Sequence, residues 1–235
     1  MRYMGSKARH AKEIIPFLMD GHNKNKPYVE PFVGGGNLFS LVPNEIKWGN
    51  DINEYAVALL DAIGNASYIP PSQVSELDYQ ICKAYPGKFP KCYVGFLAFC
   101  CSYAGKFWGG YARGEDSYGL PRNFAAEQVR SLEKQRFGLS GAVFSSVNYL
   151  DLEIPEGSTI YCDPPYFGTT KYKIDFDHEQ FWVWVKEKSE RNRVFVSEYS
   201  APDWATCVWE KRVTNSLTRE TGARVGLERL FKCYK

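Results

Sequence analysis

The sequence predicts an α/β protein with a mostly parallel sheet that a single insert interrupts. Segments typical of buried strands alternate with helix patterns near both ends of the chain, and this rhythm stops between about Asn65 and Gly141. Strands and helices that alternate in this way form parallel sheets joined by crossover helices. We therefore assign residues 1–62 and 142–235 to one core and residues 63–141 to an insert.

The first half of the core contains one helix and then two strands, each followed by a helix. The first helix carries Ala11, Ile14, Ile15 and Leu18 at the spacing of one buried stripe. The elements after it are strand Tyr28–Phe32, a turn of three glycines, a helix start at Asn37–Leu41, strand Glu45–Asp51 and helix Glu54–Ile63.

Five more strands are predicted after the insert, which brings the sheet to seven. They are Ala142–Tyr149, Thr159–Cys162, Arg193–Tyr199, Cys207–Val213 and Arg229–Tyr234. A helix is expected to begin at Asp177, which can cap it, with Gln180 three residues later to close a capping box.

The composition is that of an ordinary soluble globular protein, with 44% hydrophobic and 24% charged residues. The seven cysteines are odd in number and match no zinc spacing, so we expect reduced thiols in a cytoplasmic protein and no metal. No secretory signal is seen and no apolar run approaches the roughly 20 residues that span a bilayer. We therefore expect no contact with a membrane.

The insert combines positive charge with aromatic side chains. The whole chain has a net charge of only +2, but the window Tyr79–Phe124 holds six Lys or Arg against two acids. The same window contains twelve aromatic residues. This combination is typical of surfaces that bind nucleic acid, although many of the aromatics must simply form the core of the insert.

A glycine turn and an acid together indicate a ligand that contains a nucleoside. Asp51 ends the second strand, 21 residues beyond Glu30, about where an acid meets ribose hydroxyls in doubly wound folds. Both features also have structural readings, since glycine turns follow many strands and Asp51 could cap the next helix. Phe39 occupies the third position of the dinucleotide pattern G-x-G-x-x-G, which argues against a pyrophosphate ligand.

The strongest motif is D-P-P-Y at residues 163–166, directly after the strand Thr159–Cys162. Two prolines cannot donate backbone hydrogen bonds, so they end the strand and fix the backbone. The Asp163 carboxylate and the Pro164 carbonyl then form paired acceptors beside the Tyr166 ring. Two acceptors and a stacking surface suit a planar base that bears an amino group.

Five motifs follow one another along the chain: R-Y-M-G-S-K at 2–7, E-P-F-V-G-G-G-N at 30–37, N-D-I-N at 50–53, D-P-P-Y at 163–166 and V-S-E-Y at 196–199. In this order, the motifs resemble those of the Dam-type DNA adenine-N6 methyltransferases, the D12 class of group alpha. The resemblance implies a Rossmann-like S-adenosylmethionine-dependent methyltransferase fold, with a mostly parallel seven-stranded sheet and a mainly helical target-recognition insert.

The resemblance also implies a role for each matched residue. Tyr3 and Lys7 would lie in the N-terminal cofactor motif, and Glu30 would face the methionine end of S-adenosylmethionine. Asp51 would bind the ribose hydroxyls, and Ile52 would pack on the cofactor's adenine. The other expected cofactor contacts are Pro31, Phe32, Gly34, Gly36, Asn37, Asn148, Tyr149 and Asp163, and the catalytic set is Asp163, Pro164, Pro165 and Tyr166.

The implied reaction is direct methyl transfer from S-adenosylmethionine to the N6 amino group of a DNA adenine that has flipped out of its duplex. The cofactor product is S-adenosylhomocysteine. The residues expected to contact DNA are Lys106, Trp108, Tyr111, Arg113, Arg122 and Asn123 in the insert, and Lys171 and Tyr172 after the catalytic motif. The expected setting is the cytoplasm of a bacterium or a phage-infected host. A restriction-modification, phage or housekeeping role stays open, and no obligatory protein partner is implied.

Three other functions remain open at this stage. The acceptor could be an RNA adenine or the N4 of cytosine, although cytosine-N4 relatives more often carry Ser in place of Asp163. The chain could also be a non-catalytic nucleic-acid-binding module, which the complete D-P-P-Y motif disfavours. Phe39 disfavours a nicotinamide-dependent oxidoreductase.

Overall fold

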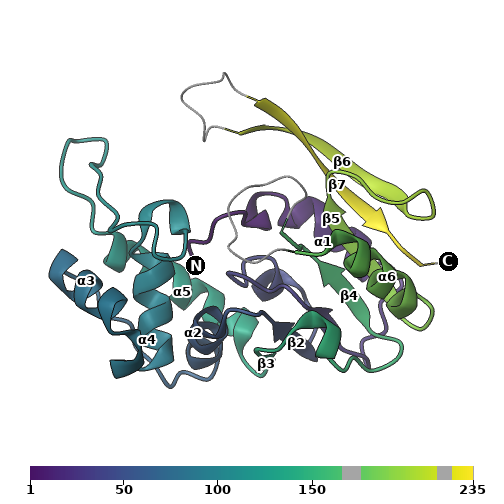
Figure 1. Ribbon diagram of the computed structural model, residues 1–235, viewed down its shortest axis with the longest axis horizontal. Helices are drawn as coiled ribbons and strands as arrows, with labels where there is room; N and C mark the ends of the chain where they lie inside the picture. Colours follow the sequence, from purple (N-terminus) through teal and green to yellow (C-terminus); the bar gives the residue numbers. More distant parts are fainter. Residues whose placement is uncertain (166–175, 216–223, 235) are drawn as a thin grey trace.

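The computed structural model describes residues 1–165, 176–215 and 224–234 and contains one seven-stranded sheet (Figure 1). The strand order is β3-β2-β1-β4-β5-β7-β6, and β7 runs antiparallel to both of its neighbours, β5 and β6. The strands are β1 (Tyr28–Glu30), β2 (Lys47–Asn50), β3 (Val143–Ser145), β4 (Thr159–Cys162), β5 (Arg193–Glu198), β6 (Thr206–Asn215) and β7 (Arg224–Lys232). This topology confirms the expected Rossmann-like methyltransferase fold.

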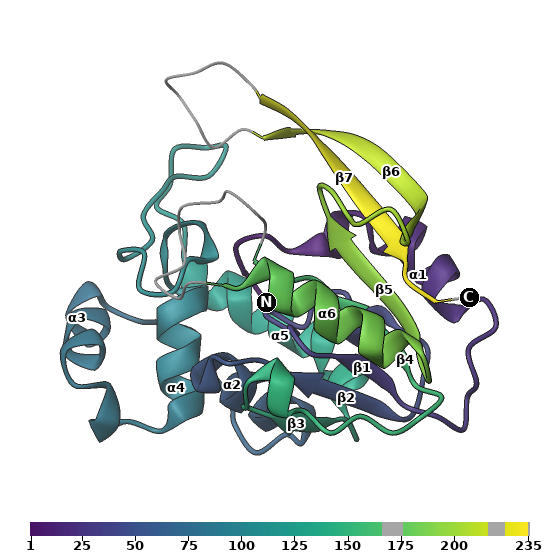
Figure 2. The same cartoon turned by 45° about the vertical axis from the view of Figure 1, so that its right-hand side comes forward.

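Side chains alternate between the two faces of the sheet, and helices cover both faces. On one face, Tyr28, Tyr161 and Phe195 pack into the core cluster that contains α1 (Ala11–Met19) and α2 (Glu54–Gly64). On the other face, Val29, Ile160 and Val194 join α6 (His178–Ser189). Figure 2 shows α6 lying across β4 and β5. Because helices cover both faces, every residue of the central strands β1 and β4 is buried.

The insert is mainly helical, as expected, and lies beside the sheet in Figure 1. Its helices are α3 (Glu76–Ala84), α4 (Lys91–Gly95), a π-helical turn η4 (Phe96–Cys100) and α5 (Phe124–Leu139). α4 packs so closely on α2 that a Cβ at Gly95 would overlap the Tyr55 carbonyl. The last turn of α5 reaches the core, where Gly138 lies against Ser40. The proposed boundaries of the insert remain a prediction.

The predicted elements differ from the observed ones mainly at their ends. β1 stops at Glu30 rather than Phe32, because Pro31 has no N–H with which to continue the ladder. The helix start expected at 37–41 is a single 3₁₀ turn, η2 (Phe39–Leu41), and the strand expected at 142–149 contracts to β3. Asp177 caps α6 by accepting a hydrogen bond from the Gln180 amide, which confirms the predicted cap, but the Gln180 side chain does not return a hydrogen bond to close the predicted capping box. Among the described helices, none is long and apolar enough to cross a membrane.

Candidate functional site

The acids predicted to be functional gather at one edge of the sheet. Glu30 ends β1, Asp51 follows β2, and Asp163 follows β4, so all three lie at carboxyl ends of parallel strands. In the sheet, β2 and β3 lie in succession on one side of β1, and β4 lies on the opposite side of β1. Open α/β sheets bind ligands at such a point, where the strand order reverses.

Glu30 is a buried carboxyl group at this edge. It accepts a hydrogen bond from the Tyr28 hydroxyl at 2.7 Å and is only 4% exposed. Burial, together with the nearby negative charge of Asp163, raises the pKa of Glu30 to about 8. The structure therefore brings Glu30 and Asp163 together, and a cationic group bound between them would favour the ionised form of Glu30.

Asp163 pairs with Lys7 from the N-terminal segment. Lys7 Nζ lies 3.1 Å from Asp163 Oδ1 and 3.5 Å from Glu228 Oε2, and Lys7 is buried. Burial alone would lower the pKa of Lys7, but the charges of Asp163 and Glu228 outweigh it and raise the pKa. Pro164 is buried and Pro165 is half-buried beside this pair. Glu228 was not predicted as a site residue, because no local sequence pattern connects it with Lys7.

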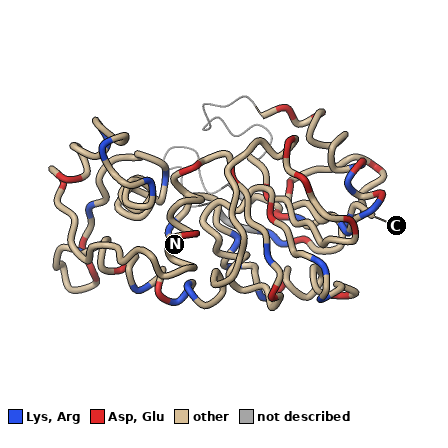
Figure 3. The backbone as a smooth tube through the Cα atoms, turned by 90° about the horizontal axis from the view of Figure 1, so that it is seen from below, with Lys and Arg blue, Asp and Glu red and all other residues tan. Residues whose placement is uncertain are grey.

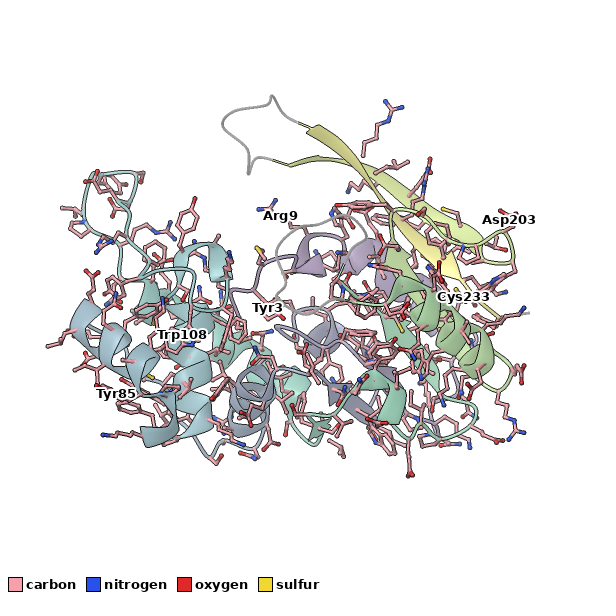
Figure 4. The ribbon with its side chains drawn as sticks, viewed as in Figure 1. Tyr3, Arg9, Tyr85, Trp108, Asp203 and Cys233 are labelled. Carbon is pink, nitrogen blue, oxygen red and sulfur yellow. The ribbon has the colours of Figure 1, made fainter. Side chains whose placement is uncertain are left out.

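The glycine turn is closed by Asp51 and covered by Tyr3. The Asp51 oxygens accept hydrogen bonds from the Gly34 and Asn53 amides, each at 2.9 Å, and burial raises the pKa of Asp51. A Cβ at Gly34 would lie 2.8 Å from the Tyr3 ring, and Gly34 has a φ of +50°. Both facts require glycine there. Tyr3 itself stacks on Phe99 of the insert at 5.1 Å (Figure 4).

Asn50 links the ends of three strands. It is the first residue of the N-D-I-N motif but was not predicted as a site residue. Its Nδ2 donates to the Pro31 carbonyl at 3.1 Å and to the Val147 carbonyl at 3.0 Å. Its Oδ1 accepts from the Ser145 hydroxyl at 2.8 Å and from the Val147 amide at 3.1 Å. Asn50 is 2% exposed. A polar residue as the last member of a buried strand was the signal that could have revealed it.

Of the remaining residues expected to contact the cofactor, some pack against other side chains and others are exposed on the surface. Phe32 packs in an aromatic cluster with Tyr149 at 5.2 Å, and burial raises the pKa of Tyr149 to about 12. Asn148 is exposed, and its side chain accepts from the Leu150 amide as a helix cap. Asn37 and Gly36 lie in the glycine turn, where Asn37 Oδ1 accepts from Gln135 of α5.

Ile52 lies on an open depression just beyond the ends of β2 and β3. Its side chain is 59% exposed, and the depression has a volume of about 510 Å³. Phe144 and Ser146 from the neighbouring strand also line it. An exposed aliphatic side chain beside a concave surface is a suitable place for a flat ring to pack.

The insert residues predicted to contact DNA take two kinds of position. Trp108 packs edge-on against Tyr79 at 5.1 Å, and the Tyr111 hydroxyl donates to the Val74 carbonyl at 2.6 Å. These two aromatics help to form the insert's own core. The exposed members are Lys106, Arg113, Arg122 and Asn123, of which Arg113 pairs with Glu76, Arg122 pairs with Glu127, and Asn123 caps α5.

A projecting loop before α5 carries exposed nonpolar residues that the sequence did not single out. An antiparallel bridge joins Glu115 to Pro121, and Asp116 accepts hydrogen bonds from the Tyr118 and Leu120 amides. Tyr118 is 87% exposed and Leu120 is 62% exposed. Along the backbone, both signs of charge occur in the insert and in the core (Figure 3).

Three of the predicted residues, Tyr166, Lys171 and Tyr172, lie outside the described residues. Within the described part of the chain, no group of three or more His, Cys, Asp or Glu is placed to hold a metal ion.

Several solved structures are similar to this one at low sequence identity and low TM-score. One is the rRNA methyltransferase aviRa from Streptomyces viridochromogenes, with 12% identity, a TM-score of 0.45, and coverage of 98% of this chain and 86% of that one. Another is the tRNA (m1A58) methyltransferase TrmI from Aquifex aeolicus, with 11% identity, a TM-score of 0.41, and coverage of 100% and 71%. A putative methylase from Haemophilus influenzae has 11% identity, a TM-score of 0.40, and coverage of 99% and 92%.

The sequence also matches a family model. Residues 3–85 match the D12 class of N6 adenine-specific DNA methyltransferases. This segment contains Tyr3, Lys7, the glycine turn, Glu30 and Asp51, which form much of the edge described above. Over residues 3–85 the match confirms the resemblance drawn from the motifs near the start of the chain, at 2–7, 30–37 and 50–53.

Proposed function

We propose that the protein transfers a methyl group from S-adenosylmethionine to the N6 amino group of adenine in DNA. The observation that carries the proposal is the position of Asp163. Its carboxylate follows β4, pairs with Lys7, and lies close enough to Glu30 to raise the pKa of that residue. One acid is thus available for the acceptor base and a second for the cofactor, on either side of the point where the strand order reverses.

The residues at this edge fit S-adenosylmethionine. A buried carboxyl such as Glu30 can hold the cofactor's ammonium group, whose positive charge would offset the cost of ionising Glu30. Each Asp51 oxygen accepts one backbone hydrogen bond and retains acceptor capacity for a ribose hydroxyl. The glycine turn brings backbone close without a Cβ, and Ile52 offers an apolar surface for the adenine ring.

The bound cofactor would supply a methyl group on a positively charged sulfur, which is already reactive. The protein therefore has to orient a poor nucleophile, because the N6 lone pair of adenine is delocalised into its ring. Asp163 and the Pro164 carbonyl would each accept one N6 hydrogen bond, which draws the nitrogen toward tetrahedral geometry and frees the lone pair. Position and a matched electrostatic environment supply most of the catalysis in such a reaction.

The acceptor must leave the duplex, because N6 is paired inside it. The insert offers the surface for this step. Arg113 and Arg122 are exposed cations that can neutralise phosphates or read guanine. Tyr118 and Leu120 are exposed nonpolar residues on the projecting loop, and such residues can fill the space that an extruded base leaves. We assign Lys106 and Asn123 to the same surface and expect double-stranded DNA as substrate.

The proposal is tested by incubating the protein with labelled S-adenosylmethionine and duplex DNA, followed by digestion to nucleosides. Label in N6-methyladenine supports it. Label in N4-methylcytosine would move the acceptor to cytosine, and transfer to RNA but not DNA would make the chain an RNA methyltransferase. Binding of DNA without any transfer would leave a nucleic-acid-binding module.

The role of Asp163 is tested separately with Asp163→Ala. Loss of one acceptor in the transition state should lower methyl transfer by about 10²- to 10³-fold. Cofactor affinity, measured by calorimetry, should change little. Asp151→Ala, which removes an exposed acid near the same edge, serves as the control. If cofactor binding disappeared in Asp163→Ala while folding was intact, the acid would serve the cofactor and not the acceptor.

A further inference from the structure

The hairpin of β6 and β7 is tied to the catalytic edge through the N-terminal segment. Glu228 lies on β7 opposite Lys211 of β6, and its side chain is largely buried against Lys7. Its neighbour Arg229 points to the other face of the hairpin, where it donates to the Tyr199 carbonyl at 2.6 Å and pairs with Glu210. Glu228 therefore faces Lys7, which also pairs with Asp163.

Three further contacts fasten the N-terminal segment to this hairpin. The Trp209 indole donates to Glu13 at 3.2 Å, Lys211 pairs with the same carboxylate at 2.5 Å, and the His10 ring lies 5.5 Å from the Trp209 ring. Glu13 belongs to α1, and His10 is the residue directly before this helix. The backbone that carries Lys7 is thus held by β6 and β7, although Lys7 and Asp163 lie more than 150 residues apart in the sequence.

Among the described residues, three acceptors lie around the ammonium of Lys7. They are the Gly5 carbonyl at 3.5 Å, Asp163 Oδ1 at 3.1 Å and Glu228 Oε2 at 3.5 Å. An ammonium group carries three donors, so the acceptors share one positive charge among them. With both acids ionised, Lys7, Asp163 and Glu228 together carry a charge of −1.

We propose that Glu228 is a positioning residue for the methyl transfer and acts through Lys7. By sharing the ammonium, Glu228 holds Lys7 beside one oxygen of Asp163 and limits how far the Asp163 charge is neutralised. The carboxylate thereby stays a strong acceptor for the amino group of the substrate. This inference rests on the proposed function, in which Asp163 binds the acceptor nitrogen.

The decisive variant is Glu228→Gln, which keeps the size of the side chain and removes its charge. With that charge removed, the Lys7 ammonium is expected to shift toward Asp163, which weakens the acceptor. Displacements of this kind reduce rates by about 10- to 100-fold. We expect kcat to fall to that extent, while the KM for the cofactor and the melting temperature change little. Glu210→Gln removes the exposed ion pair on the opposite face of the hairpin and should leave kcat unchanged.

Two further measurements distinguish positioning from simple loss of structure. Glu228→Asp should recover part of kcat, and Glu228→Gln combined with Lys7→Met should be no slower than Lys7→Met alone, because both changes act on one charge network. A purely structural role predicts additive losses that follow the melting temperature. That result, or an unchanged kcat in Glu228→Gln, would overturn the proposal.

Crystal structures of the wild type and of Glu228→Gln separate this inference from the proposed function. We expect Lys7 Nζ to move relative to Asp163 in the variant. If Lys7 and Asp163 keep their positions, Glu228 does not position them, whatever the enzyme methylates. If the wild-type protein transfers no methyl group to adenine, the proposed function fails, and the displacement of Lys7 still decides whether Glu228 sets its position.

Discussion

At the carboxyl edge of the sheet, Asn50 makes four hydrogen bonds in the interior, whereas in the insert Arg113 pairs with Glu76 at the surface. The edge gathers buried polar groups that hold one another in place. The insert buries aromatic residues such as Tyr79, Phe96 and Phe99 and leaves most of its charges exposed. Buried polar groups are costly to leave unpaired, while exposed ion pairs contribute little to stability.

The difference separates two kinds of function within one chain. At the edge of the sheet, folding and the proposed chemistry depend on the same residues, because the hydrogen bonds that close the turns also aim the acids. In the insert, the exposed cations can change with little effect on folding. The four predictions that follow test this separation, beginning with the largest expected effect.

Asn50→Ala should be the most damaging substitution for stability. It leaves the Pro31 and Val147 carbonyls and the Ser145 hydroxyl without their partner, which should cost about 3 kcal/mol of unfolding free energy. Cofactor affinity should fall as well, because the ends of β1, β2 and β3 are no longer joined. Asn44→Ala is the control, since Asn44 donates to two carbonyls at the amino end of the sheet. It should lower stability but spare cofactor binding, and equal loss of binding in both variants would contradict the role given to Asn50.

Trp108→Ala tests whether an aromatic residue of the insert serves folding. Because Trp108 packs on Tyr79 and Phe107, its removal should lower the unfolding free energy by about 2 kcal/mol. Tyr118→Ala, on the exposed loop, should change stability by less than about 0.5 kcal/mol. Urea unfolding of both variants checks the contrast. Stable Trp108→Ala protein with weakened DNA binding would show that Trp108 belongs to the interface instead.

Glu30 should make the stability of the cofactor-free protein depend on pH. Its pKa is about 8 in the fold and about 4.5 in an ordinary environment, so between these values the folded state holds a proton that the unfolded chain has released. Stability contributed by this group should therefore fall as the pH rises from about 5 to 8, by up to about 1.4 kcal/mol per pH unit. Urea unfolding at pH 6, 7 and 8 should show this slope in the wild type and a smaller one in Glu30→Gln. Parallel curves for the two proteins would refute the prediction.

Arg113→Ala should have the smallest effect on folding and a selective effect on DNA. Its ion pair with Glu76 is exposed, so the unfolding free energy should stay within about 0.5 kcal/mol of the wild type. DNA affinity should fall, and the slope of log affinity against log salt should become shallower by about one phosphate contact. Arg191→Ala removes a similarly exposed ion pair with Glu156, outside the insert, and should leave the DNA affinity and its salt dependence unchanged. Unchanged DNA binding and slope in Arg113→Ala would exclude that residue from the interface.

Sequence reasoning located the strands of the sheet and the acids that follow them. β4 was predicted with its observed bounds, and the Asp177 cap of α6 was confirmed, because hydrophobic runs, prolines and caps act through neighbouring residues. The insert was predicted to be helical only through the family resemblance. Apart from α5, its helices are short, and in η4 all five residues are buried, so no single apolar stripe appears there in the sequence.

The sequence by itself determined the order of the elements and which residues stand at strand ends, since periodicity and turn chemistry are local properties. Only the tertiary structure decided which strand ends are neighbours and which side chains share a charge. Glu30 and Asp163 meet because β4 pairs with β1, and Lys7 meets Glu228 because β7 returns beside β5. Such contacts join residues more than 100 positions apart, and their energies depend on burial and distance, which no local pattern records.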